Sequence, residues 1–390
     1  MRALLIVLIL LIGLPLAPAM AGIDLSHLSD DERAIYIKWK AARDAYEAEA
    51  ERYWTRTVAL RKHRRQKLEA GEKLTRDDYV LDQPPAYEGP AEPAAILAKL
   101  KPKDRERARN PRKADPILPM RDYVEAAADA YGFVPDRASE RAFKRNYASE
   151  ALSLGFTADQ IVRVYALETG GIGTFDMQSG MHPVTGKGKP ISTAIGYAQL
   201  VDANSVDAVA AHGGRWAKRL LMMAAGDAGE RSSRLEAKAR ILLRMREDAL
   251  TVPDDWLAHK AYAQTQKGMA LHALNLDVDI GPWMQVQKLA DTRAYAERKG
   301  KSRLTGAELE LMNLAGPQSG YEMQQRLARD MPTANFFERK GYERNAIVRG
   351  RTASELLADI ERRMQAHVDE KGAVEFLEVF QELEATSDIQ

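Results

Sequence analysis

Residues 157–171, TADQIVRVYALETGG, decide the predicted fold of this chain. Thr157 and Gln160 have the spacing of a capping box, which satisfies free amides at the start of a helix. Apolar side chains then recur at helical spacing, as on the buried face of an amphipathic helix. Gly170 and Gly171 follow directly, and glycine commonly ends helices because it adopts left-handed backbone angles without strain. The stretch therefore predicts a capped helix that packs one face into a core.

Glu168 lies on the apolar face of this predicted helix. It follows Ile161, Val164 and Tyr165 at helical spacing, so its side chain projects in the same direction as theirs. Partial burial and the negative end of the helix dipole both favour the uncharged acid, so both raise its pKa. A carboxylic acid that keeps its proton near neutral pH can serve as a general acid. The spacing alone leaves a second interpretation open, in which Glu168 reaches past the helix end to a basic partner.

The rest of the chain is predicted to be mainly α. From Arg121 almost to the C-terminus apolar residues keep helical spacing, and Thr352 with Glu355 forms another capping box. No segment alternates convincingly as a β-strand would, so a minor hairpin is the most β-structure that we expect. A further long helix is predicted from Ser29 to about Leu68.

We expect four segments: a signal peptide over 1–21, an N-terminal helical region over 22–81, a proline-rich linker over 82–119 and a helical domain over 120–385. The linker is predicted because prolines interrupt regular structure throughout it. The long helix before it presents a face that suits docking, for which a protein partner in the cell envelope is one candidate. Its basic end, residues 61–67, is interpreted as a solvated helix end whose cations complement the helix dipole.

The first 21 residues predict export. Met1 and Arg2 precede an almost wholly apolar stretch, and Ala19-Met20-Ala21 offers small residues at a cleavage point. An uncleaved membrane anchor is the alternative, but the prolines and the Ala-x-Ala end favour cleavage. The chain has no cysteine, which excludes disulfides and thiolate metal sites and favours the bacterial periplasm. Its 57 basic and 56 acidic residues give no overall field toward nucleic acid, and we expect a membrane association only through the uncleaved signal peptide.

The order of motifs after Glu168 resembles the lytic transglycosylases and goose-type lysozymes. In that family a glutamate and a small hydroxyl residue end a helix, as Glu168-Thr169 would, and a glycine-initiated segment with glutamine follows, as in Gly196-Tyr197-Ala198-Gln199. A later element, asparagine ahead of Ala-Gly-Pro, matches Asn313 within residues 312–317, where Met312 replaces the usual aromatic residue and Leu314 is inserted. The resemblance covers roughly residues 121–364 and implies a lysozyme-like catalytic domain.

The resemblance implies a peptidoglycan lytic transglycosylase. Glu168 would protonate the glycosidic oxygen between N-acetylmuramic acid and N-acetylglucosamine, and would then recover a proton from the C6 hydroxyl, leaving a 1,6-anhydro end. Gln199 and Asn313 would contact the sugars. Tyr197 would stack or hydrogen-bond along the cleft, although an aromatic residue in the core is an equally ordinary interpretation. The expected partner is the glycan strand of peptidoglycan.

Two alternatives remain open at this stage. A hydrolytic lysozyme would need a second carboxylate, for which Asp176 and Asp202 are candidates, although each suits a turn or cap better. A non-catalytic peptidoglycan-binding scaffold would keep the groove without the chemistry. The seven histidines form no metal-binding motif and no nucleophile elbow occurs, so we expect neither a metal site nor a cofactor.

Overall fold

The computed structural model describes residues 23–109, 117–182 and 185–387, and it confirms the mainly α fold. The predicted signal peptide, residues 1–21, lies outside the described residues. Among the described residues, no helix combines the length and the apolar composition that crossing a membrane requires. By internal contacts the described chain forms two units, one of residues 23–55 and 84–109, the other of residues 56–83 and 117–387.

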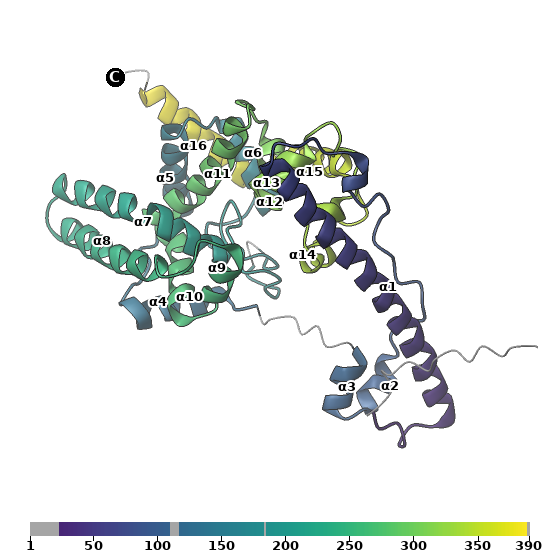
Figure 1. Cartoon of the computed structure of the whole chain (residues 1–390). Helices are drawn as coiled ribbons and strands as arrows, with labels where there is room; N and C mark the ends of the chain where they lie inside the picture. The colour runs from purple at the N-terminus through teal and green to yellow at the C-terminus, as the bar shows by residue number, and fades with distance from the viewer. Residues whose placement is uncertain (1–22, 110–116, 183–184, 388–390) are drawn as a thin grey trace, which may run out of the picture. The chain divides into compact units, whose positions relative to one another are not determined.

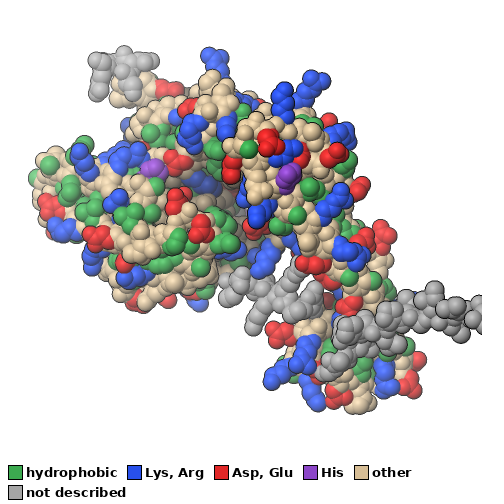
Figure 2. Space-filling view, viewed as in Figure 1, with side chains coloured by type: hydrophobic (Ala, Val, Ile, Leu, Met, Phe, Trp, Pro, Cys, Tyr) green, Lys and Arg blue, Asp and Glu red, His purple; other side chains and the backbone are tan. Residues whose placement is uncertain are grey.

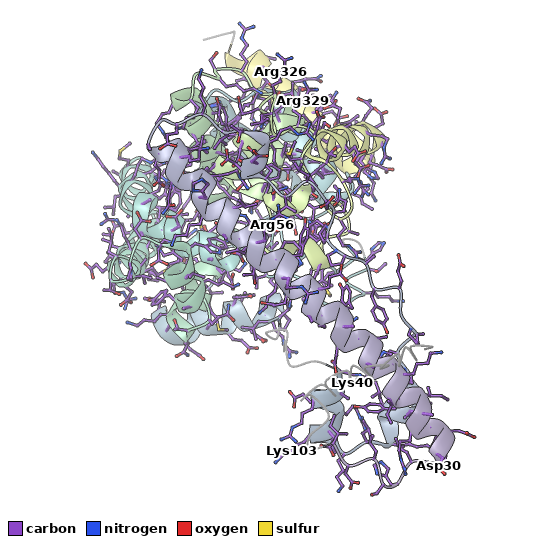
Figure 3. The ribbon with its side chains drawn as sticks, turned by 45° about the vertical axis from the view of Figure 1, so that its right-hand side comes forward. Asp30, Lys40, Arg56, Lys103, Arg326 and Arg329 are labelled. Atoms are coloured by element: carbon purple, nitrogen blue, oxygen red, sulfur yellow. The ribbon has the colours of Figure 1, made fainter. Side chains whose placement is uncertain are left out.

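The first unit contains three helices, drawn in Figure 1: α1 (Asp30–Glu69), α2 (Ala94–Lys99) and α3 (Pro102–Arg109). Only the first part of α1 belongs to this unit; the helix continues without a break into the second, carrying Asp30 and Lys40 in one and Arg56 in the other (Figure 3). Buried residues from all three helices pack together, namely Leu28, Tyr36, Trp39, Ile96, Leu97, Leu100 and Ala108. This small core holds the three helical segments of the unit together.

The predicted linker over 82–119 is wrong in its local structure, because α2 and α3 form within it. Its prolines start these helices rather than break them. Pro93 occupies the cap position before α2, and Pro102 is the first residue of α3, where a missing N–H costs no helical hydrogen bond. Arg105 then donates hydrogen bonds to the carbonyl oxygens of Leu97, Ala98 and Leu100 at the end of α2.

The basic end of α1 is solvated on one side only: Lys62 and Arg65 are exposed as expected, but Arg64 is buried, which corrects the interpretation for this residue. Arg64 is 1% exposed and its guanidinium lies 2.9 Å from the Glu322 carboxylate. It also donates to the backbone oxygens of Asp78 and Asn335, while Tyr79 donates its hydroxyl proton to the same Glu322. Residues 56–83 therefore belong to the second unit because charged and polar groups of distant segments satisfy each other there.

The second unit is built from helices and connecting loops. Its helices are α4 (Met120–Tyr131), α5 (Glu140–Ser153), α6 (Ala158–Thr169), α7 (Asp202–Ala225), α8 (Glu230–Ala249), α9 (Trp256–Tyr262), α10 (Gln266–His272), α11 (Ile280–Arg298), α12 (Gly306–Ala315), α13 (Pro317–Met323), α14 (Arg339–Arg344), α15 (Ala353–His367) and α16 (Lys371–Ser387). Short 3₁₀ turns are η2 (Arg76–Asp78), η3 (Ala273–Leu276) and η4 (Thr333–Asn335). The loop between α6 and α7 has only isolated β-bridges, such as Met181 with Gly188.

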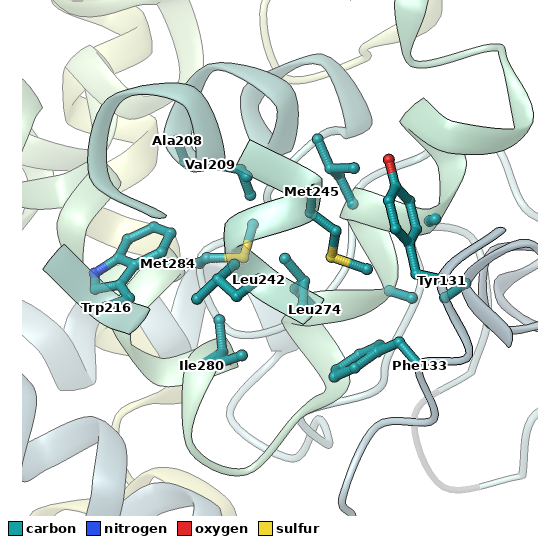
Figure 4. Packing of buried hydrophobic residues seen from close by; sticks show 14 of the residues in the cluster. Tyr131, Phe133, Ala208, Val209, Trp216, Leu242, Met245, Leu274, Ile280 and Met284 are labelled. Atoms are coloured by element: carbon teal, nitrogen blue, oxygen red, sulfur yellow. The ribbon is translucent and has the colours of Figure 1, made fainter. Parts of the chain in front are cut away.

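The main core lies where α7 and α8, paired side by side in Figure 1, meet α4, α10 and α11. Figure 4 shows Leu242 and Met245 of α8 packed toward Leu274 and Met284. All four side chains are fully buried, together with Trp216 of α7. Each fully buried apolar side chain of this size contributes about 1.5–3 kcal/mol from its removal from water.

We expect Arg64→Ala to lower the free energy of unfolding of the second unit by about 3–5 kcal/mol, because it leaves Glu322 buried without its countercharge. Denaturant unfolding followed by circular dichroism measures this change. Arg65→Ala is the matched control, since Arg65 is the next residue of α1 but is exposed. Equal stability of the two variants would contradict a stabilising role for the Arg64 site.

Candidate active site

The helix predicted from residues 157–171 is present as α6, with both of its predicted ends. The Thr157 hydroxyl accepts a hydrogen bond from the Gln160 backbone amide at 3.2 Å, and the Gln160 side-chain oxygen Oε1 accepts one from the Thr157 backbone amide at 3.1 Å. Gly170 ends the helix in the left-handed conformation, with φ of 63°. These local rules place Glu168 in the last turn of α6, where the free carbonyl groups of the helix disfavour an additional negative charge.

Glu168 faces a second carboxyl group, that of Glu310 on α12. The side chains of the two residues are close enough to hydrogen-bond to each other. Glu168 is half-buried, whereas Glu310 is fully buried. The amino group of Lys288, on α11, also acts electrostatically on both carboxyl groups, but it forms no direct ion pair with either among the described residues. The site is therefore a two-carboxyl cluster with one nearby cation.

Burial raises the pKa of both carboxyl groups. For Glu168 desolvation is the largest cause, and the hydrogen bond with Glu310 and the charge of Lys288 act in the opposite direction. For Glu310 desolvation and the charge of Glu168 raise the pKa well above the usual glutamate range. Burial lowers the pKa of Lys288. Glu310 thus holds its proton more strongly and can donate a hydrogen bond to Glu168 whenever Glu168 is ionised.

Asn313 joins the cluster to the loop before α7. Its amide nitrogen lies 3.1 Å from Glu310 Oε2 and 3.4 Å from the carbonyl oxygen of Ala198. The oxygen of the same amide, Asn313 Oδ1, is buried without a hydrogen-bond partner among the described residues. Because an unsatisfied buried acceptor costs about 1–3 kcal/mol, this atom is an expected point of attraction for a donor that enters the site.

Gln285, on α11, holds the turn that Gly196 begins. The Gln285 side-chain oxygen accepts a hydrogen bond from the Ala198 amide at 3.2 Å. Gly196 has φ of 82°, and a Cβ atom at this position would collide with the Gln285 amide group. Only glycine satisfies both the backbone angle and the close approach. The glycine of the predicted motif is therefore required by its contact with α11.

Gln199 completes the same turn. Its φ of 44° is the only positive value among the described non-glycine residues. The side-chain nitrogen donates to the Gly196 carbonyl oxygen at 2.8 Å and to that of Met177 at 3.3 Å, which offsets the backbone strain. Gln199 Oε1 accepts no hydrogen bond from a described residue, and the side chain is half-buried. Its oxygen remains available to a polar ligand.

Tyr197 occupies the core, which is the second interpretation that the sequence left open. Its ring is 1% exposed and packs against Phe143, Tyr147, Tyr165 and Phe376. Its hydroxyl donates to the Glu140 carboxylate. A ring enclosed in this way has no free face for a sugar. Tyr197 instead anchors the turn at residues 196–199 by packing its ring into the core.

Neither aspartate considered as a second carboxylate joins Glu168. Asp176 accepts a hydrogen bond from Arg137 at 2.8 Å and another from Thr174, as expected of a turn residue. Asp202 is buried at the start of α7, where its oxygens accept bonds from Thr193 and Gln264. Both side chains are held by other partners, in agreement with the turn and cap roles favoured by the sequence.

The sequence analysis missed Glu310, Lys288 and Gln285. Glu310 could have been found from the sequence, because it precedes Asn313 by one helical turn and therefore shares its face of α12. Lys288 and Gln285 share a face of α11 in the same way, but no motif connects that helix with Glu168. Their roles depend on the packing of α11 against α12.

Figure 2 shows a hollow on one face of the second unit, between the helices α7–α9 and the helices α12–α15. Comparison of the chain with family models, with curated proteins and with solved structures found no match. The function must therefore be inferred from the site itself.

We expect Gly196→Ala to destabilise the protein by about 2–4 kcal/mol, because the new methyl group meets both an unfavourable backbone angle and the Gln285 side chain. The matched control is Gly186→Ala, in the same loop, where φ is 62° but nothing lies within 4 Å of the added Cβ. The difference in unfolding temperature between the two variants reports the cost of the collision between the added methyl group and Gln285. A loss of stability no larger than that of the control would show that Gln285 does not constrain the turn.

Proposed function

We propose that this protein is a peptidoglycan lytic transglycosylase that uses Glu168 as its general acid and base. The observation that carries the proposal is a half-buried carboxyl group with a raised pKa, placed at a helix end with no ion pair to a basic side chain among the described residues. A carboxylate locked to an arginine would stay ionised at neutral pH and would have no proton to donate. The order of motifs, which resembles that of lytic transglycosylases, suggests peptidoglycan glycan as the substrate.

The reaction begins with proton transfer from the Glu168 carboxyl to the glycosidic oxygen. The bond between that oxygen and C1 of N-acetylmuramic acid breaks, leaving an oxocarbenium-like centre at C1. The Glu168 carboxylate then accepts the proton of the C6 hydroxyl, and the C6 oxygen bonds to C1. The products are a chain with a free 4-hydroxyl on N-acetylglucosamine and a 1,6-anhydro end, and no water is consumed.

Glu310 assists this cycle without touching the substrate. After Glu168 releases its proton, its anion accepts a hydrogen bond from the protonated Glu310, and the charge of Lys288 stabilises it further. Both groups make proton release easier in a site where burial alone would hold the proton too strongly. Glu310 is therefore a positioning residue for Glu168.

The same pairing favours the lytic outcome over hydrolysis. Glycosidases that use two carboxyl groups hold them on either side of the bond, about 5–5.5 Å apart when retaining and about 6.5–9.5 Å apart when inverting. Glu168 and Glu310 are instead within hydrogen-bonding reach of each other, and Asp176 and Asp202 are engaged elsewhere. Since neither Glu310 nor the two described aspartates has the spacing of a second catalytic carboxyl group, an internal nucleophile such as the C6 hydroxyl suits this site best.

The expected substrate is the glycan strand of peptidoglycan in the periplasm, reached through the predicted signal peptide. The unpartnered oxygens of Gln199 and Asn313 are proposed to accept hydrogen bonds from sugar hydroxyl or amide groups. The proposed chemistry requires no metal or cofactor. The end of each product strand would carry an anhydro sugar, which distinguishes the reaction from that of a hydrolytic lysozyme.

We expect Glu168→Gln to abolish glycan cleavage, with a loss of about 10²–10⁴-fold or more, because the amide has no acidic proton. Purified peptidoglycan is incubated with each protein, and the soluble fragments are identified by mass spectrometry. Asp176→Asn is the matched control and should retain activity. Anhydro-muropeptides from the wild type alone would support the proposal. Reducing ends would indicate hydrolysis, and no release from the wild type would favour a non-catalytic scaffold.

The pH dependence of kcat/KM should show an alkaline limb above the ordinary glutamate value of 4.5, since the active acid is protonated and its pKa is raised. Activity is retained below this pKa and lost as the pH rises through it. The charge of Lys288 lowers the pKa of Glu168, so Lys288→Met should move the limb to higher pH. Lys218→Met, at an exposed position of α7, is the control. An unchanged or acid-shifted limb in Lys288→Met would contradict this electrostatic role.

A further inference from the structure

A second group of chemically active side chains lies away from Glu168, where α9 meets α7. Asp207 of α7, Asp254 of the segment after α8, and His259 of α9 each offer one ligand atom, and these atoms lie within 4.8 Å of one another. Both aspartates are exposed, so the cluster is open to ions from solution. The glycan-cleaving site proposed above uses none of these residues.

His259 is the feature that distinguishes this cluster from an ordinary acidic surface. Its side chain is 6% exposed, yet its imidazole accepts or donates no hydrogen bond among the described residues. A ring nitrogen of His259 nevertheless lies within 4.8 Å of a carboxylate oxygen of each aspartate. A buried imidazole usually bonds a carboxylate, a carbonyl group or water, so this nitrogen is a ligand atom without an assigned partner.

The charges around the cluster also favour a cation. No lysine or arginine of the described chain pairs with Asp207 or Asp254. A bound divalent ion would remove their mutual repulsion.

We propose that Asp207, Asp254 and His259 form a binding site for a divalent transition metal, with zinc as the best match. One imidazole and two carboxylates, with water in the fourth position, make a familiar tetrahedral zinc environment. Zinc bonds of about 2.1 Å place ligand atoms about 3.4 Å apart, so ligand atoms at the 4.8 Å limit need to approach each other by about 1.4 Å. The imidazole selects zinc over magnesium or calcium, which prefer oxygen ligands alone.

The ion would join α7, the segment that follows α8, and α9. Asp254 lies next to Asp255, whose side chain caps α9 by accepting bonds from the amides of Leu257 and Ala258 at 2.9 Å. A metal bound to Asp254 and His259 would hold this helix start, and Asp207 would tie it to α7. The site thus serves to fasten α9 and the preceding turn, and it is independent of the proposed glycan cleavage.

The test measures metal binding by the purified full chain, without reference to glycan activity. The protein is stripped with a chelator and titrated with zinc chloride by calorimetry, and bound metal is counted by mass spectrometry of the elements. The wild type should bind one zinc ion and gain thermal stability on binding. The double variant Asp207→Asn/Asp254→Asn should bind zinc at least about tenfold more weakly and lose the thermal gain.

Asp129→Asn, at an exposed position of α4, is the matched control and should bind zinc like the wild type. Because the two substituted aspartates are exposed, the double variant should stay folded, and circular dichroism verifies this. Three results would overturn the proposal: no stoichiometric zinc binding by the wild type, equal zinc binding by the folded double variant, or equal affinity for magnesium and zinc.

Discussion

Two carboxyl groups held against each other in a protein interior are disfavoured as a pair of anions, because burial removes solvation and the two negative charges repel. Glu168 and Glu310 are in this situation, and within the described part of the chain Lys288 is the cation that lowers the pKa of both. At least one of the two carboxyl groups is therefore expected to be protonated at neutral pH. The fully buried Glu310 holds its proton more strongly, so the proton that can be exchanged with a ligand is the further one on the half-buried Glu168, whose pKa burial also raises. The proposed acid catalysis depends on this asymmetry.

The surrounding structure maintains this arrangement by fixing three backbone segments. The left-handed Gly170 ends α6 directly after the carboxyl group, and the Tyr165 hydroxyl holds the outgoing loop by donating to the Gly173 carbonyl oxygen at 2.7 Å. The turn at Gly196 is pressed against Gln285, and Asn313 links that turn to Glu310. Buried aromatic rings around Tyr197 support the turn from the opposite side. Strain at Gln199 is tolerated because these contacts determine its position from several directions.

Sequence motifs located the proposed acid, but they did not predict which other motif residues would be buried and which would be accessible. Glu168 was predicted at a helix end and is found there, since capping and glycine termination are local effects. Tyr197 belongs to the same motif as Gln199, yet its ring is in the core while the Gln199 side chain is half-buried. Neighbouring residues of an irregular loop point in directions that only the surrounding helices select. For the same reason Arg64, which looked like one of several solvated cations, is buried beside Glu322.

The sequence alone determined the helical class, the ends of α6 and the presence of an acid on an apolar face, because these follow from spacing and capping within about one or two helical turns. It did not determine that the acid has a carboxyl partner, that α2 and α3 form in a proline-rich segment, or that Asp207, Asp254 and His259 converge. Those features join residues from different helices, so their distances depend on packing rather than on local propensity. Only the tertiary structure brings α6, α11 and α12 together, and the pKa of Glu168 is decided there because desolvation and charge are properties of the surroundings of a residue.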